Sequence, residues 1–206
     1  MNAAWVETAF VLLLFGGYLG LWRLKRMRQR RSTGVDPEVL GKTGDPVQTF
    51  FAHAARGLTV LVVVVIAVHA VGFELSPWLA RDARIDRRLL DYVGLATGLF
   101  GLTLCWIAQS TMGNAWRVGI DDKPGPGLVR TGIYSRVRNP TYLGLYLVNG
   151  GLFLIWPTPA VLAFAIAFYL LMEFQVRCEE AQLIVWFGDD YRQYLAKTWR
   201  YVPWLY

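Results

Sequence analysis

Five apolar stretches recur along the chain, with polar segments between them. They lie at about 3–22, 57–73, 92–108, 142–156 and 160–172. A membrane-spanning helix needs about 20 mostly apolar residues, and the last three stretches reach that length when their polar ends are included. The pattern predicts an all-α integral membrane bundle of about five transmembrane helices. Because residues 156–159 (Trp-Pro-Thr-Pro) leave room only for a tight turn, the fourth and fifth spans are expected to be antiparallel neighbours.

The composition agrees with a membrane protein. Hydrophobic residues make up 55% of the chain and charged residues 17%, with a mean hydropathy of +0.34. Soluble domains carry about 25% charged residues. This composition, with nine Trp, ten Tyr and eleven Phe, excludes a disordered chain and an ordinary soluble domain.

The positive charges predict the orientation. Residues 23–56, 109–138 and 177–206 hold 17 of the 21 Lys and Arg residues, whereas residues 74–91 hold four. Cytoplasmic segments are enriched in Lys and Arg, so the N terminus is expected outside and the C terminus inside. The first apolar stretch has its basic run after it, which is typical of an anchor and not of a secretory signal. We expect a bacterial inner (cytoplasmic) membrane as the location.

The sequence predicts neither a nucleic-acid partner nor a bound metal ion. The net charge of +6 is explained by the cytoplasmic segments, so no nucleic-acid partner is predicted beside the lipid bilayer. Two His and two separated Cys, without a CxxC or HxxxH motif, predict no metal site. The sequence does not indicate an oligomeric state.

The first informative segment is the loop at 113–140, GNAWRVGIDDKPGPGLVRTGIYSRVRNP. Long loops in compact proteins are usually functional, and alternating Pro and Gly stiffen the backbone while allowing close approach to a ligand. Asn139 and Pro140 are favoured at the N-cap and first position of a helix. Such a helix start suits a bound carboxylate, although it is also consistent with a well-capped membrane helix.

The second informative segment follows the fifth apolar stretch. Glu173 lies where this stretch stops, and Glu179 and Glu180 lie about two turns later. Carboxylates at a membrane boundary indicate function unless they are paired. They could hold a cation or the hydroxyls of a ribose, or form salt bridges with Arg177 and other basic residues. Gly188 is expected to end this helix, and residues 191–206 are expected to form an interfacial element.

Both segments resemble one family. GLVRTGIYSRVRNPTYLG resembles the LVxxGxYxxxRHPxYxG signature of the isoprenylcysteine carboxyl methyltransferase (ICMT) family, and EEAQLIVWFGDDYRQYL resembles its EExxLxxxFGxxYxxY tail. The motifs match in order, in spacing and in their placement around a helical hairpin. Phospholipid and methanethiol methyltransferases resemble the same tail, and sterol reductases share a related C-terminal half.

The resemblance implies a membrane methyltransferase that uses S-adenosylmethionine at the cytoplasmic face. We expect two parts. Residues 1–110 hold helices 1–3 and a solvated basic linker at 23–56, and residues 111–206 hold the methyltransferase core that the resemblance implies. The acceptor would be a lipophilic molecule or a small thiol, carboxylate or amine. The implied cofactor-binding residues are Pro126, Gly127, Leu128, Val129, Tyr134, Asn139, Pro140, Thr141, Tyr142, Glu179 and Glu180.

Two departures from the family pattern bear on the chemistry. Asn139 stands where the family usually has His, so this position can cap a helix and bind but cannot act as a protonated acid. Gln175 stands where prenylcysteine enzymes have an Arg thought to hold the substrate carboxylate, and Arg177 lies two positions away. Asn139 and Arg177 therefore remain positioning candidates, and no catalytic residue is assigned.

The sequence leaves two other functions open. The first is an NADPH-dependent reductase of the sterol-reductase kind, in which Arg130, Arg136 and Arg138 would clamp a 2′-phosphate. The second is a non-enzymatic membrane scaffold.

Overall fold

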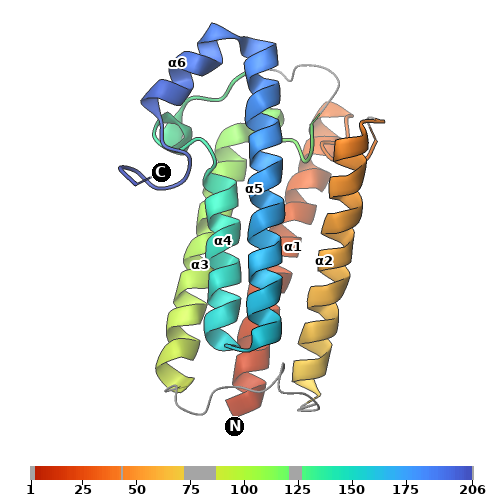
Figure 1. The fold of residues 1–206 in the computed structure, drawn as a ribbon, viewed down its shortest axis with the longest axis vertical. Helices are drawn as coiled ribbons and strands as arrows, with labels where there is room; N and C mark the ends of the chain where they lie inside the picture. Colours follow the sequence, from red (N-terminus) through yellow and green to blue (C-terminus); the bar gives the residue numbers. More distant parts are fainter. Residues whose placement is uncertain (1–2, 43, 72–86, 121–126, 206) are drawn as a thin grey trace.

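The protein is an all-helical bundle in which five long helices run nearly parallel to one axis (Figure 1). The computed structural model describes residues 3–42, 44–71, 87–120 and 127–205. The bundle helices are α1 (Ala3–Thr33), α2 (Pro46–Ala70), α3 (Arg87–Met112), α4 (Pro140–Ile155) and α5 (Pro159–Phe187). Short helices η1 (Gly113–Ala115), η2 (Gly132–Ser135) and α6 (Asp189–Lys197) lie at one end of the bundle, together with the C-terminal tail.

The helices alternate in direction as predicted for five spans. Four of them, α1, α2, α3 and α5, are long and apolar enough to cross a membrane, and α4 is a shorter apolar helix of 16 residues. At about 1.5 Å per residue, α4 covers roughly 24 Å, slightly less than a hydrocarbon core of about 30 Å. Helices α4 and α5 pack side by side after a tight turn, which confirms the predicted hairpin.

Helix ends extend beyond the apolar stretches. α1 continues through the basic run to Thr33, and α2 begins at Pro46, where Asp45 accepts a hydrogen bond from the backbone of Val47. The segment expected as a solvated linker at 23–56 is therefore largely helical. Arg, Lys, Leu, Met and Gln are good helix formers, so a helix continues where its hydropathy falls.

Glycines allow α3 and α4 to approach closely. A Cβ atom on Gly101 would lie 2.5 Å from the backbone oxygen of Gly144, and one on Gly151 would lie 2.5 Å from that of Gly94. Small residues at such crossings allow two membrane helices to pack at short distance. This contact places the end of α3 beside the start of α4, so the two ends of the loop that joins these helices lie close together.

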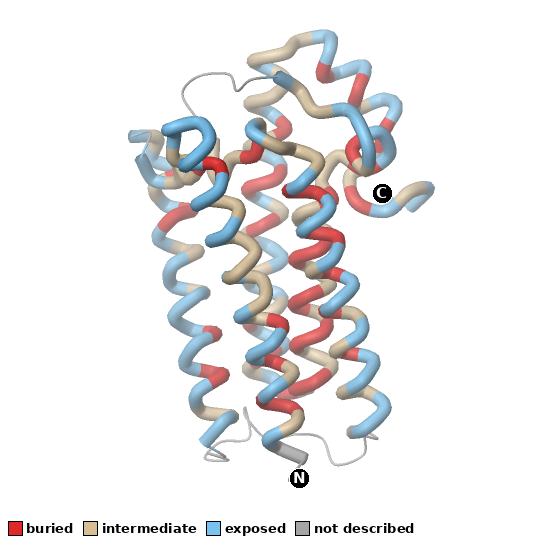
Figure 2. The backbone as a smooth tube through the Cα atoms, turned by 180° about the vertical axis from the view of Figure 1, so that it is seen from behind, coloured by how far each residue is buried: buried red, intermediate tan, exposed pale blue. Residues whose placement is uncertain are grey.

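Buried and exposed residues alternate along the helices of the bundle (Figure 2). The outward faces carry many large apolar residues, among them Phe50, Phe100, Trp106 and Leu170, each at least 56% exposed. An apolar surface of this extent is expected of a bundle surrounded by lipid. The side of the membrane to which each end points, and the boundary at residue 110 between two parts, remain predictions.

Candidate functional site

A cavity of about 160 Å³ lies at the end of the bundle where the loops gather. One wall comes from the loop after α3, and the other from the last turns of α5 and from α6. Aromatic and apolar side chains dominate the lining, and a few polar groups converge on it, as in small-molecule sites generally. The lining residues are Met112, Ala115, Arg117, Gly119, Ile120, Gly127, Leu128, Val129, Tyr134, Arg138, Asn139, Glu179, Glu180, Gln182, Leu183, Trp186, Phe187, Tyr191 and Tyr194.

The cavity brings together most of the residues implied by the motifs. Those that line it are Gly127, Leu128, Val129, Tyr134, Asn139, Glu179 and Glu180. Pro140, Thr141 and Tyr142 lie in the first turn of α4 and are not part of the lining. Pro126 lies outside the described residues.

Glu179 is positioned by two uncharged donors. Its Oε1 accepts hydrogen bonds from the hydroxyl of Tyr142 at 2.8 Å and from Nε2 of Gln175 at 3.0 Å. Tyr142 therefore acts behind the cavity wall, through Glu179. The other oxygen, Oε2, receives no hydrogen bond from the described residues, and Glu179 lines the cavity. It is thus the carboxylate with an acceptor atom left for a ligand.

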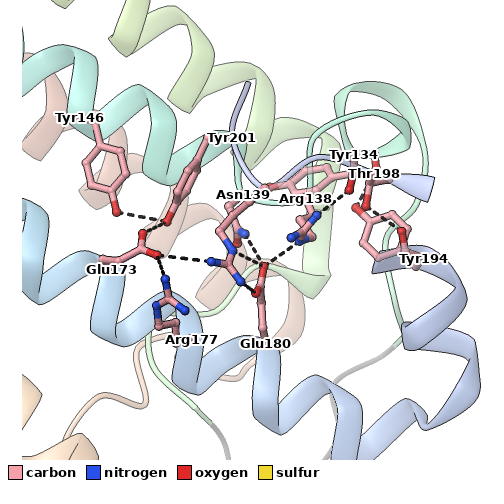
Figure 3. Close-up of polar contacts among 11 residues, drawn as sticks. Tyr134, Arg138, Asn139, Tyr146, Glu173, Arg177, Glu180, Tyr194, Thr198 and Tyr201 are labelled. Atoms are coloured by element: carbon pink, nitrogen blue, oxygen red, sulfur yellow. Dashed lines mark hydrogen bonds and ion pairs between the residues drawn. The ribbon is translucent and has the colours of Figure 1, made fainter. Parts of the chain in front are cut away.

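Glu180 is in the opposite situation, because it is paired with two guanidinium groups (Figure 3). Its Oε1 accepts from Nε of Arg138 at 2.8 Å and from Nδ2 of Asn139 at 2.9 Å. Its Oε2 accepts from Nη2 of Arg200 at 2.7 Å. Charge-assisted bonds of this kind are about twice as strong as neutral ones. Glu180 therefore ties α5 to the loop and the tail.

Asn139 lies at the predicted start of a helix, but its side chain makes a different hydrogen bond from the predicted one. It is the residue before α4, with Pro140 at the first helical position. Its side chain does not cap the helix and instead donates to Glu180. The carboxylate that lies near the start of α4 is therefore the side chain of Glu180.

The C-terminal tail supports the cavity wall from behind, which the motifs alone did not indicate. Val137 and Trp199 form an isolated parallel β-bridge. The backbone N–H of Arg138 donates to Trp199 and that of Asn139 to Arg200, at 3.0 and 3.1 Å. The tail is thereby aligned so that the Arg200 side chain reaches Glu180.

A second acidic centre lies next to this one, at Glu173 on α5 (Figure 3). Glu173 pairs with Arg177 at 3.0 Å and with Arg200 at 3.4 Å, and it accepts a hydrogen bond from the hydroxyl of Tyr201. Arg177 points to Glu173 and does not line the cavity. The salt-bridge interpretation therefore holds for Glu173 and Glu180, whereas Glu179 accepts hydrogen bonds from uncharged groups.

A hydrogen bond between two lining tyrosines joins α6 to the loop before α4. The hydroxyl of Tyr194 donates to the backbone oxygen of Tyr134 at 2.7 Å. Burial raises the pKa of Tyr194 to about 12, so this donor keeps its proton at neutral pH. Gly188 ends α5 with φ +52°, a conformation that favours glycine, and so lets α6 turn over the cavity.

The basic segment after the first span helps to build the loop wall. Lys25 donates to the backbone oxygen of Gly113, and Gln29 donates to those of Asn114 and Trp116. Residues 37–40 then pair with Val118 through three backbone hydrogen bonds of 3.0–3.1 Å. The N-terminal part of the chain therefore shapes one side of the cavity, a role beyond the topology expected of it.

Comparisons with known proteins lead to the same family as the motifs. The family model described as isoprenylcysteine carboxyl methyltransferase (ICMT) family matches residues 94–185. A protein-S-isoprenylcysteine O-methyltransferase of Schizosaccharomyces pombe is 34% identical over 77 residues, which cover 37% of this chain and 33% of the relative. One from Dictyostelium discoideum is 27% identical over 117 residues, covering 55% of this chain and 49% of the relative.

The fold also has a match among solved structures. The structure of a eukaryotic intramembrane Ras methyltransferase ICMT aligns with a TM-score of 0.52 and 19% identity, covering 95% of this chain and 68% of the other. The chain spans about a third to a half of the length of the curated relatives it matches. Together these matches confirm that the chain resembles the isoprenylcysteine carboxyl methyltransferase family, in sequence over residues 94–185 and in its helical fold.

Proposed function

We propose that the protein is an integral membrane methyltransferase that uses S-adenosylmethionine and binds it in the cavity between the α3–α4 loop and the end of α5. One observation carries this proposal. Glu179 lines the cavity with one carboxylate oxygen held by Tyr142 and Gln175 and with the other left without a donor from the described residues. A carboxylate arranged in this way suits the hydroxyls or the ammonium group of a nucleoside–amino acid conjugate.

The other lining residues fit the rest of such a ligand. Trp186, Phe187 and Tyr191 offer aromatic surface for a purine, and Leu128 and Val129 offer an apolar wall. The sulfonium of S-adenosylmethionine supplies an electrophilic methyl group. The protein's part is to align the reacting groups and to exclude water. Asn139 serves this part by holding Glu180, and we assign it no acid–base step.

The acceptor is proposed as a lipophilic molecule, or a small thiol, carboxylate or amine, that reaches the site at the cytoplasmic face. The relatives' name makes an isoprenylcysteine carboxylate the first acceptor to test. Gln175 is uncharged and is engaged with Gln48 and Glu179, so it offers no cation for a carboxylate. For this reason thiols and amines belong in the same test.

Cofactor binding is the direct test. Titration of S-adenosylhomocysteine into the purified 206-residue chain is expected to give saturable binding and a raised melting temperature, because a ligand that binds the native state stabilises it. NADPH is the comparison ligand. Of the three arginines proposed as a phosphate clamp for a reductase, Arg138 is engaged with Glu180, and Arg130 contacts Asp190 in an exposed pair. Binding of NADPH without binding of S-adenosylhomocysteine would overturn the proposal.

The acceptor is identified by transfer of a radiolabelled methyl group. Prenylated cysteine, phosphatidylethanolamine and small thiols are incubated with the chain in lipid nanodiscs. The expected result is label in one class of acceptor, with loss of transfer in Glu179→Gln. Label in none of them, with cofactor binding intact, would refute the acceptor classes proposed here.

A further inference from the structure

We infer that Gln48, far from the motifs in sequence, is a positioning residue that fixes the direction of a hydrogen-bond chain ending on Glu179. The inference rests on the proposed function, because its consequence is tighter binding of the cofactor. It assigns a role in the site to the first turn of α2.

The chain consists of three consecutive hydrogen bonds, and Nε2 of Gln175 also donates to Oε1 of Gln48 at 3.4 Å, in the same amide orientations. The backbone N–H of Ile120 donates to Oε1 of Gln48 at 3.0 Å. Nε2 of Gln48 donates to Oε1 of Gln175 at 3.2 Å. Nε2 of Gln175 then donates to Oε1 of Glu179 at 3.0 Å. Ile120 and Glu179 both line the cavity, so the chain joins its two walls.

The direction of the chain is set at its start. A backbone N–H can only donate, so Gln48 must turn its oxygen towards Ile120 and its nitrogen towards Gln175. Gln175 must then accept on its oxygen and present its nitrogen to Glu179. If Gln175 were reversed, its oxygen would face the carboxylate and repel it. The backbone of the loop thereby ensures that Glu179 meets a donor.

Burial makes this arrangement costly to break. Gln48 and Gln175 are each 1% exposed, so neither amide can replace its partner with bulk water. Buried amides without partners are strongly unfavourable. The two glutamines come from α2 and α5, which pack against each other in this end of the bundle. Removal of either side-chain amide is therefore expected to disturb the position of the Glu179 carboxylate.

The test uses Gln48→Met and Gln175→Met in the 206-residue chain, since Met keeps the length of the side chain and removes the amide donor and acceptor. Each variant is expected to bind S-adenosylhomocysteine about tenfold more weakly, the scale set by one buried hydrogen bond to a charged group. The double variant is expected to bind no more weakly than the Gln175 variant alone, because both act through one chain. Gln193→Met, at an exposed position on α6, is the matched control and is expected to bind as the wild type does.

The outcomes separate this inference from the proposed function. If the wild type does not bind S-adenosylhomocysteine, the proposed function fails. If the wild type binds, and Gln48→Met binds equally well, the inference fails. It also fails if the effects of the two single variants multiply in the double variant, because that result indicates two independent structural losses.

Hydrogen exchange on the wild type supplies a test that does not depend on folding of a variant. On addition of S-adenosylhomocysteine, the amide of Ile120 and the first turn of α2 are expected to exchange more slowly together. Protection confined to the end of α5, with Ile120 unchanged, would overturn the inference.

Discussion

Arg200 holds Glu180 from the C-terminal tail with two nitrogens, Nη2 at 2.7 Å from Oε2 and Nε at 3.3 Å from Oε1. The side chains are 14% and 8% exposed, so this two-point contact is largely shielded from water. It connects the last residues of the chain to the residue next to the proposed cofactor ligand. The tail therefore supports the cavity wall at Glu180.

Removal of this contact is expected to destabilise the fold. Arg200→Ala leaves Glu180 with Arg138 and Asn139 and is expected to cost about 2–3 kcal/mol, as for loss of a buried charged hydrogen bond. The melting temperature of the purified protein measures the loss. Arg192→Ala is the matched control, because Arg192 is an exposed partner of Asp189 and surface pairs contribute about 0–1 kcal/mol. Equal melting temperatures for the two variants would show that the tail contact is not structural.

The neighbouring carboxylates are expected to differ in what they do. Glu179→Gln removes the charge that lines the cavity and is expected to weaken S-adenosylhomocysteine binding more than tenfold, since a bond to a charged group contributes about 1.5–3 kcal/mol. Tyr142 and Gln175 can still contact the new amide, so the melting temperature without ligand is expected to change little. Glu180→Gln leaves two guanidinium groups with a neutral partner and is expected to lower that melting temperature. Calorimetry measures the affinity of both variants for S-adenosylhomocysteine, and thermal melts measure their stability. Unchanged affinity in Glu179→Gln would refute the role of Glu179 in cofactor binding.

The sequence predicted the helices well and their ends less well. Apolar stretches mark the thickness of a bilayer, and all five coincide with helices of the bundle. They do not mark where a helix ends in water, because polar residues such as those at 23–33 are good helix formers. Gly188 and Pro140 were predicted as a helix end and a helix start because their backbone restrictions act locally.

The site was only partly predictable, for a similar reason. Motifs located Glu179, Glu180 and Asn139, which line one cavity. The partners of Glu180 were not identified, because Arg200 reaches it through a backbone pairing of the tail that leaves no local pattern. Gln48 lies two positions after Pro46 in the first turn of α2, and its contact with Gln175 spans 127 positions. No spacing rule detects a contact of that range.

The close crossing of α3 and α4 gives a stability prediction. In Gly144→Ala the new Cβ would lie 2.6 Å from Sγ of Cys105 and 2.7 Å from the backbone oxygen of Gly101, so the helices must separate. Overpacking of this kind costs about 1–3 kcal/mol. Gly150→Ala on the same helix has no neighbour within 4 Å and is expected to be neutral or stabilising, since Ala favours helices by about 1 kcal/mol. Thermal melts compare the two variants. An equal fall in melting temperature in both would contradict the close packing of α3 and α4 at Gly144.

The segment after α1 gives a pH prediction. Hydrogen bonds from Arg26 hold the pKa of Asp36 well below its usual range. Its contribution to stability is therefore fully present above the unfolded pKa of about 4 and is lost as the pH falls towards the folded value. Asp36→Asn is expected to melt at a lower temperature than the wild type at pH 7, with the gap closing below about pH 4. A difference in melting temperature that stays constant below about pH 4 would show that the charge of Asp36 does not stabilise the fold.

The tail beyond the site is expected to lie at the membrane interface. Tyr201 contacts Glu173, where the apolar part of α5 ends, and the next residues include Trp204 and Leu205, which are 85% and 82% exposed. Trp and apolar residues at that depth favour the boundary between headgroups and acyl chains. A nitroxide on Leu205→Cys in nanodiscs, with Cys178→Ser to avoid a second label, is expected to be relaxed more by dissolved oxygen than by a water-soluble nickel chelate. The same label on Gln193→Cys, at an exposed position on α6, is expected to show the reverse order, and a nickel-dominated signal at both positions would place the tail in water.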